Sequence, residues 1–257
     1  MSGSKRGRTD RTSGPHVAPS GRFFLIPWHI GDVRDLTFNA LWLVRRLDFL
    51  LVEDVESARR DLIRLRADPR AKTLVAVPRD SDPALTARVL SALAGGDVGL
   101  VASGGIASFV DPGAWLVSEL RRLGVSLVAT AGASALTTML ALSGIEWRAK
   151  TTSNFTFAMF FDEDGDGRAD GRFIALARRR EPLFVFLKKS EVARCMALLE
   201  PVVKDRPVTL YFDLAKSPPE KFPLSGVVRA RACSQWRREL SSLPWDRIDD
   251  VSLMVGP

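Results

Sequence analysis

The chain has 257 residues, of which 46% are hydrophobic and 26% charged, with a formal net charge of +7. This composition is typical of a globular protein with one large or two moderate domains, and its apolar runs are far shorter than the roughly 18 residues of a membrane span. The two cysteines, Cys195 and Cys233, lie far apart with no histidine nearby. Their placement excludes the spacing of a structural zinc site and favours a reducing compartment such as the cytoplasm.

Residues 1–21 form a basic segment rich in Gly, Ser and Pro. Together with Arg22, this segment has five basic residues and one acidic residue, so it contributes +4 of the net charge of +7. It has no apolar stretch that could serve as a secretory signal, and its composition cannot build a core. We expect a disordered basic tail, which fits either a solubilising role or contact with RNA. The same two roles fit the basic residues Lys188, Lys189 and Arg178–Arg180.

Short apolar runs alternate with helical patterns between residues 22 and 150. Strands are predicted at 22–27, 48–54, 73–78, 97–103 and 125–130, and helices at 36–47, 57–66, 82–93, 112–123 and 135–142. Apolar strands that alternate with helices are typical of a parallel sheet covered on both faces. The pattern predicts an N-terminal α/β domain over residues 22–150.

Further apolar runs predict a second α/β domain over residues 151–257. Strands are expected at 155–161, 182–188, 207–214 and 250–256, with helices at 172–180 and 190–203. The proline-rich stretch 218–226 is expected to be an irregular loop.

Two loops of small residues follow two strands of the first domain. The strand at 97–103 is followed by Gly104 and Gly105, and the strand at 125–130 by the sequence AGASA over residues 131–135. Ligands of open parallel sheets bind outside the carboxyl ends of the strands, and glycine allows close approach to the backbone. The loops predict a shallow pocket lined by backbone, although tight strand–helix turns without a ligand would look the same.

The helix after the first of these loops has clear end signals. Asp111 is expected as its N-cap, Pro112 as its first residue and Gly124, with positive φ, as the residue that ends it.

Neither small-residue loop is a phosphate-binding motif. The sequence contains no G-x-x-x-x-G-K-[ST], and the first strand is followed by PWHIGD, with Gly31 as its single glycine, instead of G-x-G-x-x-G. A backbone-lined pocket without a phosphate loop suits a nucleoside-like ligand that carries no pyrophosphate.

Four segments occur in an order that is characteristic of one family: FLIPWHIGDVRDLTFNAL, LVED, VGLVASGGIASFVDPGAWLVSELRRLGV and AGASALTTMLALSG. They resemble the signature segments of the tetrapyrrole methylase superfamily (class III S-adenosylmethionine-dependent methyltransferases), and are most similar to the ribosomal RNA small-subunit methyltransferase I type. The resemblance covers residues 22–145 well and the second half weakly. It implies two α/β domains with the ligand cleft between them, S-adenosylmethionine (SAM) as cofactor, a homodimer, and methylation of RNA at a ribose hydroxyl.

The resemblance also implies which residues hold SAM, mainly through backbone groups. They are Pro27, Ile30, Gly31, Ser103, Gly104, Gly105, Ile106, Phe109, Val110, Ala131, Gly132, Ala133, Ser134, Ala135 and Phe160. Methyl transfer from a sulfonium is an in-line displacement, in which the protein aligns donor and acceptor and excludes water. No metal is required.

Several signature residues of the family are replaced in this chain. Residues 103–107 lack the aspartate, threonine and proline that the family has there, and the acidic stretch DEDGDGRADG (162–171) stands where the family has basic residues. The family's leucine-threonine-lysine motif is reduced to Leu214, Ala215 and Lys216. Two alternatives therefore stay open: methylation of a small, tetrapyrrole-like molecule, and a non-catalytic protein that only binds SAM.

Four polar residues are candidates for a catalytic role. His29 lies in the loop beside the predicted pocket, where it fits a general base or a local polar filler. Glu53 and Asp54 end a strand and precede a helix, so they fit helix capping as well as substrate positioning. Lys216 belongs to the reduced motif.

One acidic loop matches the beginning of a calcium-binding loop, with Asp162, Asp164, Asp166 and Gly167 in the matching positions. The last position of such a loop needs a bidentate glutamate, and Phe173 occupies it here. We expect the segment 162–170 to be a polar loop that does not bind calcium.

Overall fold

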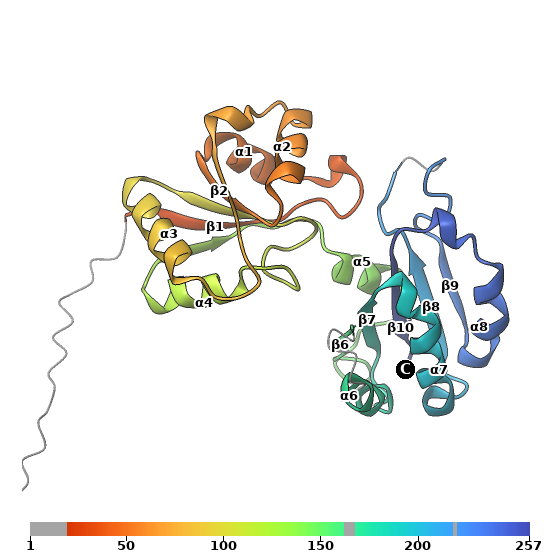
Figure 1. Ribbon diagram of the computed structural model, residues 1–257. Helices are drawn as coiled ribbons and strands as arrows, with labels where there is room; N and C mark the ends of the chain where they lie inside the picture. Colours follow the sequence, from red (N-terminus) through yellow and green to blue (C-terminus); the bar gives the residue numbers. More distant parts are fainter. Residues whose placement is uncertain (1–19, 162–167, 218–219) are drawn as a thin grey trace, which may run out of the picture. The chain divides into compact units, whose positions relative to one another are not determined.

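The computed structural model describes residues 20–161, 168–217 and 220–257 (Figure 1). The chain forms two compact units. The first comprises the chain up to Ile26, Phe38–Ser103 and Ala107–Thr130, and the second comprises Pro27–Thr37, Gly104–Ile106 and Ala131–Pro257. The loop after the first strand and three residues of the first small-residue loop thus belong to the second unit. The basic tail up to residue 19 and the acidic residues 162–167 lie outside the described residues, and the boundary near residue 150 stays a prediction.

The first unit contains a parallel sheet. Its strands are β1 (Arg22–Ile26), β2 (Phe49–Val52), β3 (Thr73–Ala76), β4 (Val98–Val101) and β5 (Ser126–Ala129), in the order β3-β2-β4-β1-β5. Every pairing between them is parallel; Phe23 of β1, for example, lies opposite Val98 and Leu127. The central strand β4 is buried along its whole length, as expected for a strand covered on both faces.

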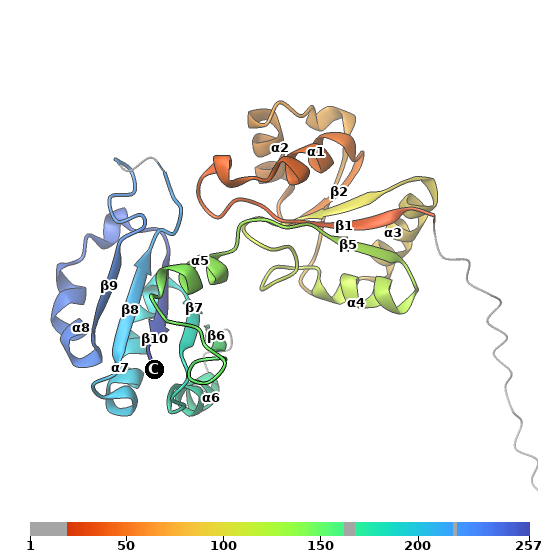
Figure 2. The ribbon, with the colours of Figure 1, turned by 180° about the vertical axis from the view of Figure 1, so that it is seen from behind.

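Four helices cover this sheet, and their starts follow from the sequence. They are α1 (Phe38–Arg46), α2 (Val55–Arg64), α3 (Pro83–Gly95) and α4 (Ala114–Arg122). Helices α1 and α2 lie on one face of the sheet, and α3 and α4 on the other (Figures 1 and 2). The carboxylate of Asp54 accepts a hydrogen bond from the Ser57 N–H (2.6 Å) and so caps α2, and Asp82 caps α3 in the same way.

The predicted start of α4 is wrong. The helix begins at Ala114, Gly113 is its N-cap residue with φ = 108°, and Asp111 makes no capping bond. The reason lies in the preceding loop, where Ser108 (φ = 62°) and Val110 (φ = 72°) are also left-handed. This path delays the first helical hydrogen bond, from the Val117 N–H to the Gly113 carbonyl (3.0 Å). The predicted end is confirmed, because Gly124 follows the helix with φ = 76°.

The second unit contains a mixed sheet. Its strands are β6 (Thr156–Phe160), β7 (Leu183–Leu187), β8 (Pro207–Phe212), β9 (Val228–Ala232) and β10 (Val251–Val255), in the order β6-β7-β10-β8-β9. Strands β6 and β7 are parallel and the other pairings are antiparallel. The helices are α5 (Ala135–Leu142), α6 (Arg168–Ala177), α7 (Val192–Val203) and α8 (Cys233–Glu239). Strand β9 and helix α8 were not predicted.

The two faces of the second sheet have different cores. On one face, Trp236 of α8 is fully buried and donates to the Val208 carbonyl (2.8 Å), within a cluster that also contains Phe160 and both cysteines. Burial raises the pKa of the Cys233 thiol to about 11, so this residue acts as an apolar core residue. On the other face, Met139 of α5 packs against Tyr211 of β8. The second face is the one next to the candidate site.

Short 3-10 helices complete the structure at Val33–Asp35, Pro69–Ala71, Lys189–Glu191, Leu240–Ser242 and Trp245–Arg247. Among the described residues, no helix has the length and apolar character that a membrane crossing requires.

Candidate functional site

The loop after β1 and the first small-residue loop meet in the second unit. Trp28 and Gly105 form an antiparallel bridge, in which the Trp28 N–H donates to the Gly105 carbonyl (2.8 Å) and the Gly105 N–H to the Trp28 carbonyl (3.2 Å). Gly105 has φ = 73°, a conformation that disfavours any side chain. The bridge therefore fixes the path of both loops.

Packing within the unit explains two of the glycines. A Cβ on Gly132 would lie 2.2 Å from Pro27 Cγ, and a Cβ on Gly31 would lie 2.4 Å from the Ala215 carbonyl oxygen. Both glycines are needed so that neighbouring chain segments can approach. Gly104 differs, because the nearest atom to its Cβ position, the His29 carbonyl oxygen, is 3.7 Å away. Its missing side chain is not explained by packing and leaves its backbone open.

The structure divides the predicted cofactor residues between the two units. The second unit holds Pro27, Ile30, Gly31, Gly104, Gly105, Ile106, Ala131, Gly132, Ala133, Ser134, Ala135 and Phe160, and the first unit holds Ser103, Phe109 and Val110. Phe160 lies in the core, where its ring contacts Phe173 (4.7 Å between centroids) and the Arg194 guanidinium (4.9 Å from the ring centroid).

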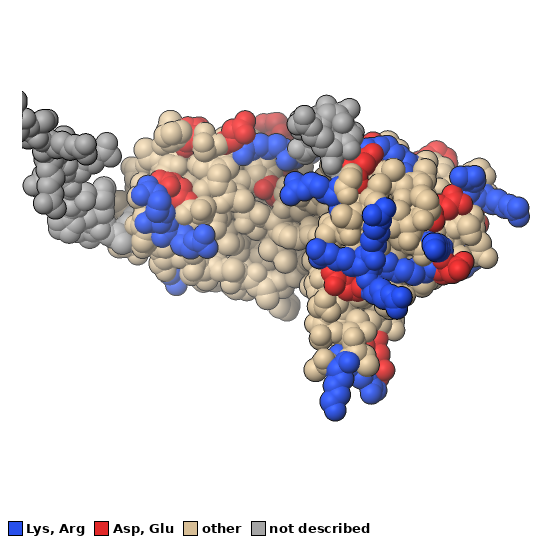
Figure 3. Space-filling model, turned by 90° about the horizontal axis from the view of Figure 1, so that it is seen from below, with Lys and Arg blue, Asp and Glu red and all other residues tan. Residues whose placement is uncertain are grey.

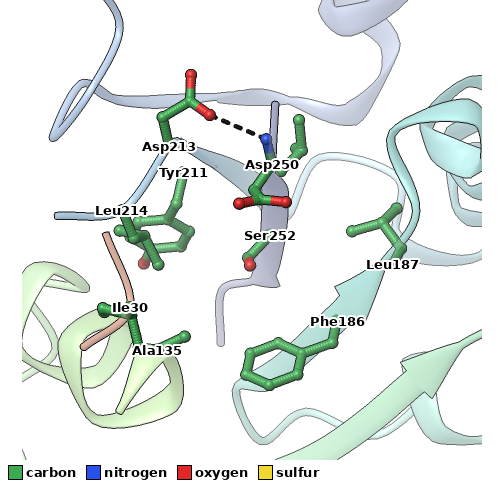
Figure 4. Close-up of a pocket in the computed structure, with 10 residues that line it drawn as sticks. Ile30, Ala135, Phe186, Leu187, Tyr211, Asp213, Leu214, Asp250 and Ser252 are labelled. Carbon is green, nitrogen blue, oxygen red and sulfur yellow. Dashed lines mark hydrogen bonds between the residues drawn. The ribbon is translucent and has the colours of Figure 1, made fainter. Parts of the chain in front are cut away.

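A cavity of about 190 Å³ opens in the second unit beside α5 (Figure 4). Ile30 and Ala135 lie on one side of it and Phe186 and Leu187 on the other, with Ser252 between them. Its remaining lining residues are Tyr211, Asp213, Leu214, Asp250 and Val251. The wall is mainly apolar, with a few polar groups placed at one end. Ile30 and Ala135, both predicted cofactor residues, contribute to this wall.

Asp213 is the most deeply buried of the acidic residues that line the cavity. Its side chain is fully buried, and its Oδ1 accepts a hydrogen bond from the Asp250 N–H (2.9 Å, Figure 4) and one from the Asp249 N–H (2.9 Å). Its Oδ2 is buried without a hydrogen-bond partner among the described residues. Sequence reasoning did not single out Asp213, although a carboxylate directly after an apolar strand was the available signal.

Lys216 is surrounded by carboxylates. Its ammonium pairs with Asp213 (3.6 Å), with Asp249 (3.4 Å) and with Asp250. Burial lowers the pKa of Lys216, but these carboxylates, Asp250 first, outweigh burial and hold the pKa above its usual value. Lys216 is therefore a permanent cation at neutral pH and cannot act as a base.

The segment 213–217 is tied to the loop after β1. The Ser225 hydroxyl lies within hydrogen-bond distance of the carbonyls of Asp213 (2.8 Å) and Lys216 (2.6 Å), and its single hydrogen, shared between them, holds the segment in place. The Ser217 hydroxyl donates to Asp32 Oδ2 (2.7 Å). The Arg34 guanidinium, together with this hydroxyl, keeps the pKa of Asp32 well below its usual range. These contacts connect the two chain segments that border the cavity.

The carboxyl edge of the first sheet has its own polar groups. The Ser103 hydroxyl, after β4, donates to Glu53 Oε2 (2.5 Å), after the neighbouring strand β2. Partial burial and the charge of Glu53 raise the pKa of Asp111 to about 6, while Arg79 acts in the opposite direction. Asp54 is engaged in capping α2. Sequence reasoning missed Asp111 as a titrating group, because it assigned this residue to a helix cap.

His29 and the predicted basic rim occupy different places in the second unit. The ring of His29 lies 5.9 Å from that of Trp28, in the loop that borders Gly104. In Figure 3, Lys and Arg side chains gather on the lower face of this unit. Arg178–Arg180 are exposed, and the Arg206 guanidinium donates to the carbonyls of Ala177 (2.8 Å) and Arg179 (2.7 Å) in the same turn.

The remaining observations concern Lys189, from the predicted basic surface, and possible metal ligands. Lys189 donates to the carbonyls of Trp245 (2.9 Å) and Ile248 (2.6 Å), so its ammonium stabilises the fold. Within the described part of the chain, no group of three His, Cys, Asp or Glu residues is placed to hold a metal ion. The residues Asp162, Asp164 and Asp166 are outside that part.

The fold and the site together define a class of protein. A parallel α/β unit is combined with a mixed α/β unit, and the loops at the carboxyl ends of the first sheet carry glycines and polar groups. This is the architecture of two-domain α/β methyltransferases. The chain belongs to the tetrapyrrole (corrin/porphyrin) methylase family, whose model matches residues 22–221. The chain is a methyltransferase, and the resemblance found in its four signature segments is confirmed.

Solved structures show the same fold. A uroporphyrin-III C-methyltransferase from Thermus thermophilus matches with a TM-score of 0.57 and 21% identity over 92% of this chain and 94% of the other. A cobalt precorrin-4 methyltransferase of cobalamin biosynthesis matches with a TM-score of 0.64 and 15% identity, over 91% and 94% of the two chains. At these identities, the likeness is one of fold.

Relatives in the comparison by sequence are named for ribosomal RNA, not for tetrapyrroles. The ribosomal RNA small subunit methyltransferase I of Leptospira biflexa is 27% identical over 199 residues, which is 77% of this chain and 79% of the relative. The enzyme of the same name from Thermotoga maritima is 27% identical over 205 residues, or 79% of this chain and 87% of the relative.

Proposed function

We propose that this methyltransferase transfers the methyl group of SAM to RNA, at a ribose hydroxyl of the small ribosomal subunit. The observation that carries the proposal is the likeness to relatives named for ribosomal RNA, at 27% identity over more than three quarters of both chains. The tetrapyrrole enzymes match at 21% identity or less, so they support the fold and leave the acceptor open.

The cavity in the second unit fits the nucleoside part of SAM. Its apolar wall, with Ile30, Ala135 and Tyr211, suits the flat face of a base, and Ser252 offers a polar contact. Pro27, Gly105, Ile106 and the backbone of 131–134 belong to the same unit and complete the proposed site there. Ser103, Phe109 and Val110 belong to the first unit and stay predicted cofactor residues. When bound, SAM supplies a methyl group on a positively charged sulfur that an in-line attack can remove.

The residues of the chain then have separate tasks. The loops orient the donor and exclude water, which is the main contribution of a protein to this type of displacement. Lys216 holds the segment 213–217 against Asp249 and Asp250 and does not take a proton. A ribose hydroxyl must lose its proton, and His29 and Glu53 are the proposed acceptors.

The SAM site is tested by filling the cavity. Ala135 lines it, whereas Ala141 lies exposed on the same helix, so Ala141→Leu is a matched control for Ala135→Leu. At 100 times its Kd, SAM should stabilise the wild type and Ala141→Leu by about 2.7 kcal/mol in thermal unfolding. Ala135→Leu should fold and lose this stabilisation. If SAM stabilises Ala135→Leu as much as the wild type, the cavity is not the cofactor site.

The acceptor is tested with SAM that carries a radiolabelled methyl group and a fractionated cell extract. We expect label in RNA of the small ribosomal subunit, and its loss from the precipitate after ribonuclease treatment. Label in a small-molecule fraction would instead favour a tetrapyrrole-like acceptor. Stabilisation by SAM without label in any fraction would favour a non-catalytic binding protein.

The family resemblance also underlies the proposal of a cytoplasmic homodimer. Sedimentation at micromolar concentration should give twice the chain mass of 28.3 kDa. A mass near 28.3 kDa would contradict the dimer and leave the methyl-transfer proposal intact.

A further inference from the structure

Helix α1 has a core face and a second, aromatic face. Ala40, Leu43 and Val44 are buried, as the helical period requires for a helix that packs on a sheet. On the outer side, Phe38 is 93% exposed and Trp42 is 53% exposed, one turn apart and about 6 Å along the helix axis. Two large aromatic side chains so exposed on one stripe need a partner, because aromatic residues are normally buried.

The charged residues within α1 itself are all positive. Arg45 and Arg46 end the helix, and α1 contains no acidic residue. The Arg46 guanidinium lies 5.2 Å from the centre of the Trp42 ring, which places a cation beside the aromatic face. Arg45 is held in place by the Leu65 carbonyl (2.7 Å). The surface thus combines flat rings with ordered cations.

The C-terminal end of the aromatic stripe, which consists of Phe38 and Trp42, lies near Arg22, the residue that follows the basic segment 1–21. Arg22 pairs with Asp97 (2.8 Å), and the charge of Arg46 acts on the same carboxylate, so the C-terminal end of α1 lies near the start of β1. The residues before Arg22 include Lys5, Arg6, Arg8 and Arg11. Positive charge therefore continues along the chain from the end of the stripe.

We infer that the outer face of α1 binds a single-stranded segment of the RNA substrate, with bases stacked on Trp42 and Phe38 and a phosphate at Arg46. Interleaved aromatic rings and basic groups are the usual means of holding single-stranded nucleic acid, because every base has a face that stacks and every linkage has a charge. This inference rests on the proposed RNA acceptor and adds a place where the RNA is held.

A second copy of the chain fits this face less well. Trp42 and Phe38 expose on the order of 300 Å², against roughly 800 Å² per partner in a standard interface. Helix α1 of a second copy would also bring no carboxylate to pair with Arg45 and Arg46. A polyanion supplies both the flat partners and the opposite charge.

The test measures the binding of a single-stranded RNA oligonucleotide by full-length chains that differ at Trp42. Trp42→Ala should weaken binding about 5- to 140-fold, whereas Trp42→Phe, which keeps an aromatic ring, should bind nearly as the wild type does. Phe38→Ala should also weaken binding. Ile63→Ala, which removes a 63% exposed apolar side chain from α2, is the control and should have no effect.

The salt dependence separates stacking from charge. Trp42→Ala should leave the slope of log K against log salt unchanged, because stacking releases no counterions. Arg46→Gln should flatten it by about 0.7. Stabilisation by SAM should be the same in all these variants, which shows that they are folded.

Three outcomes would overturn the inference. If the wild type methylates RNA and Trp42→Ala binds RNA as tightly as the wild type, the RNA-binding role of α1 is refuted and the proposed RNA acceptor stands. If Trp42→Ala converts a dimer into a monomer in sedimentation, the stripe is an interface between copies. If the wild type neither binds nor methylates RNA, the inference fails together with the proposed acceptor.

Discussion

The buried carboxylate of Asp213 offers the sharpest test of how the site is held together. In Asp213→Ala, the N–H groups of Asp249 and Asp250 lose the acceptor that each has at 2.9 Å. These hydrogen bonds are part-buried, and a hydrogen bond of this kind contributes about 0.5 to 1.5 kcal/mol net, so the loss of both should cost about 1 to 3 kcal/mol. Asp213 also has φ = 44°, which Asp tolerates better than Ala, and this adds about 1 kcal/mol.

Asp213→Asn is the matched control. The amide keeps a carbonyl oxygen for both N–H groups and tolerates the left-handed backbone, so its loss of unfolding free energy should be much smaller. Lys216 still has Asp249 and Asp250 as partners in this variant. The difference between the two variants therefore measures the hydrogen bonds together with the backbone contribution of about 1 kcal/mol.

Urea unfolding, followed by near-ultraviolet circular dichroism, measures the effect. The midpoint of the second unit's transition should fall strongly in Asp213→Ala and slightly in Asp213→Asn, with unchanged slopes. Because the segment 213–217 is bonded to the loop after β1, stabilisation by SAM should also decrease in Asp213→Ala. A loss below about 1 kcal/mol in Asp213→Ala, or equal losses in both variants, would refute the reasoning.

Four further predictions use other parts of the chain. Gly132→Ala should lose about 1 to 3 kcal/mol of unfolding free energy, because its Cβ would lie 2.2 Å from Pro27 Cγ. Gly104→Ala should unfold like the wild type yet bind SAM more weakly in calorimetry; unchanged affinity would show that no ligand approaches this backbone. The pKa of Asp111 is raised from 3.8 to about 6, so the folded chain binds this proton more tightly and its stability falls as pH rises through that range. Asp111→Asn should therefore melt higher than the wild type at pH 7.5, with a difference that shrinks toward pH 4. Deleting residues 1–21 removes four basic residues, so the salt slope of RNA binding should flatten by nearly 3 units, and equal slopes would exclude the tail from binding.

Local patterns in the sequence were sufficient for most of the architecture. The apolar runs that became β1 to β5 alternate with helical patterns, and this alternation alone favours a parallel sheet, because a buried strand must be apolar on both sides. Gly124 lies where helix-end chemistry puts it. The four signature segments were enough to indicate the methylase family, since their order along the chain follows that of the family. Strand β9, with the sequence VRARA, escaped notice because an edge strand needs few apolar residues.

Only the tertiary structure brought the polar groups of the site together. Asp213 and Lys216 lie more than thirty residues from Asp249 and Asp250 in sequence, and the pairing of β8 with β10 makes them neighbours. These carboxylates hold the pKa of Lys216 above its usual value. The roles of the glycines were decided in the same way: Gly132 and Gly31 make room for neighbouring backbone and side chains, and Gly104 alone of these three leaves open space. A sequence shows which side chain is missing, but the reason for its absence depends on what lies beside it in space.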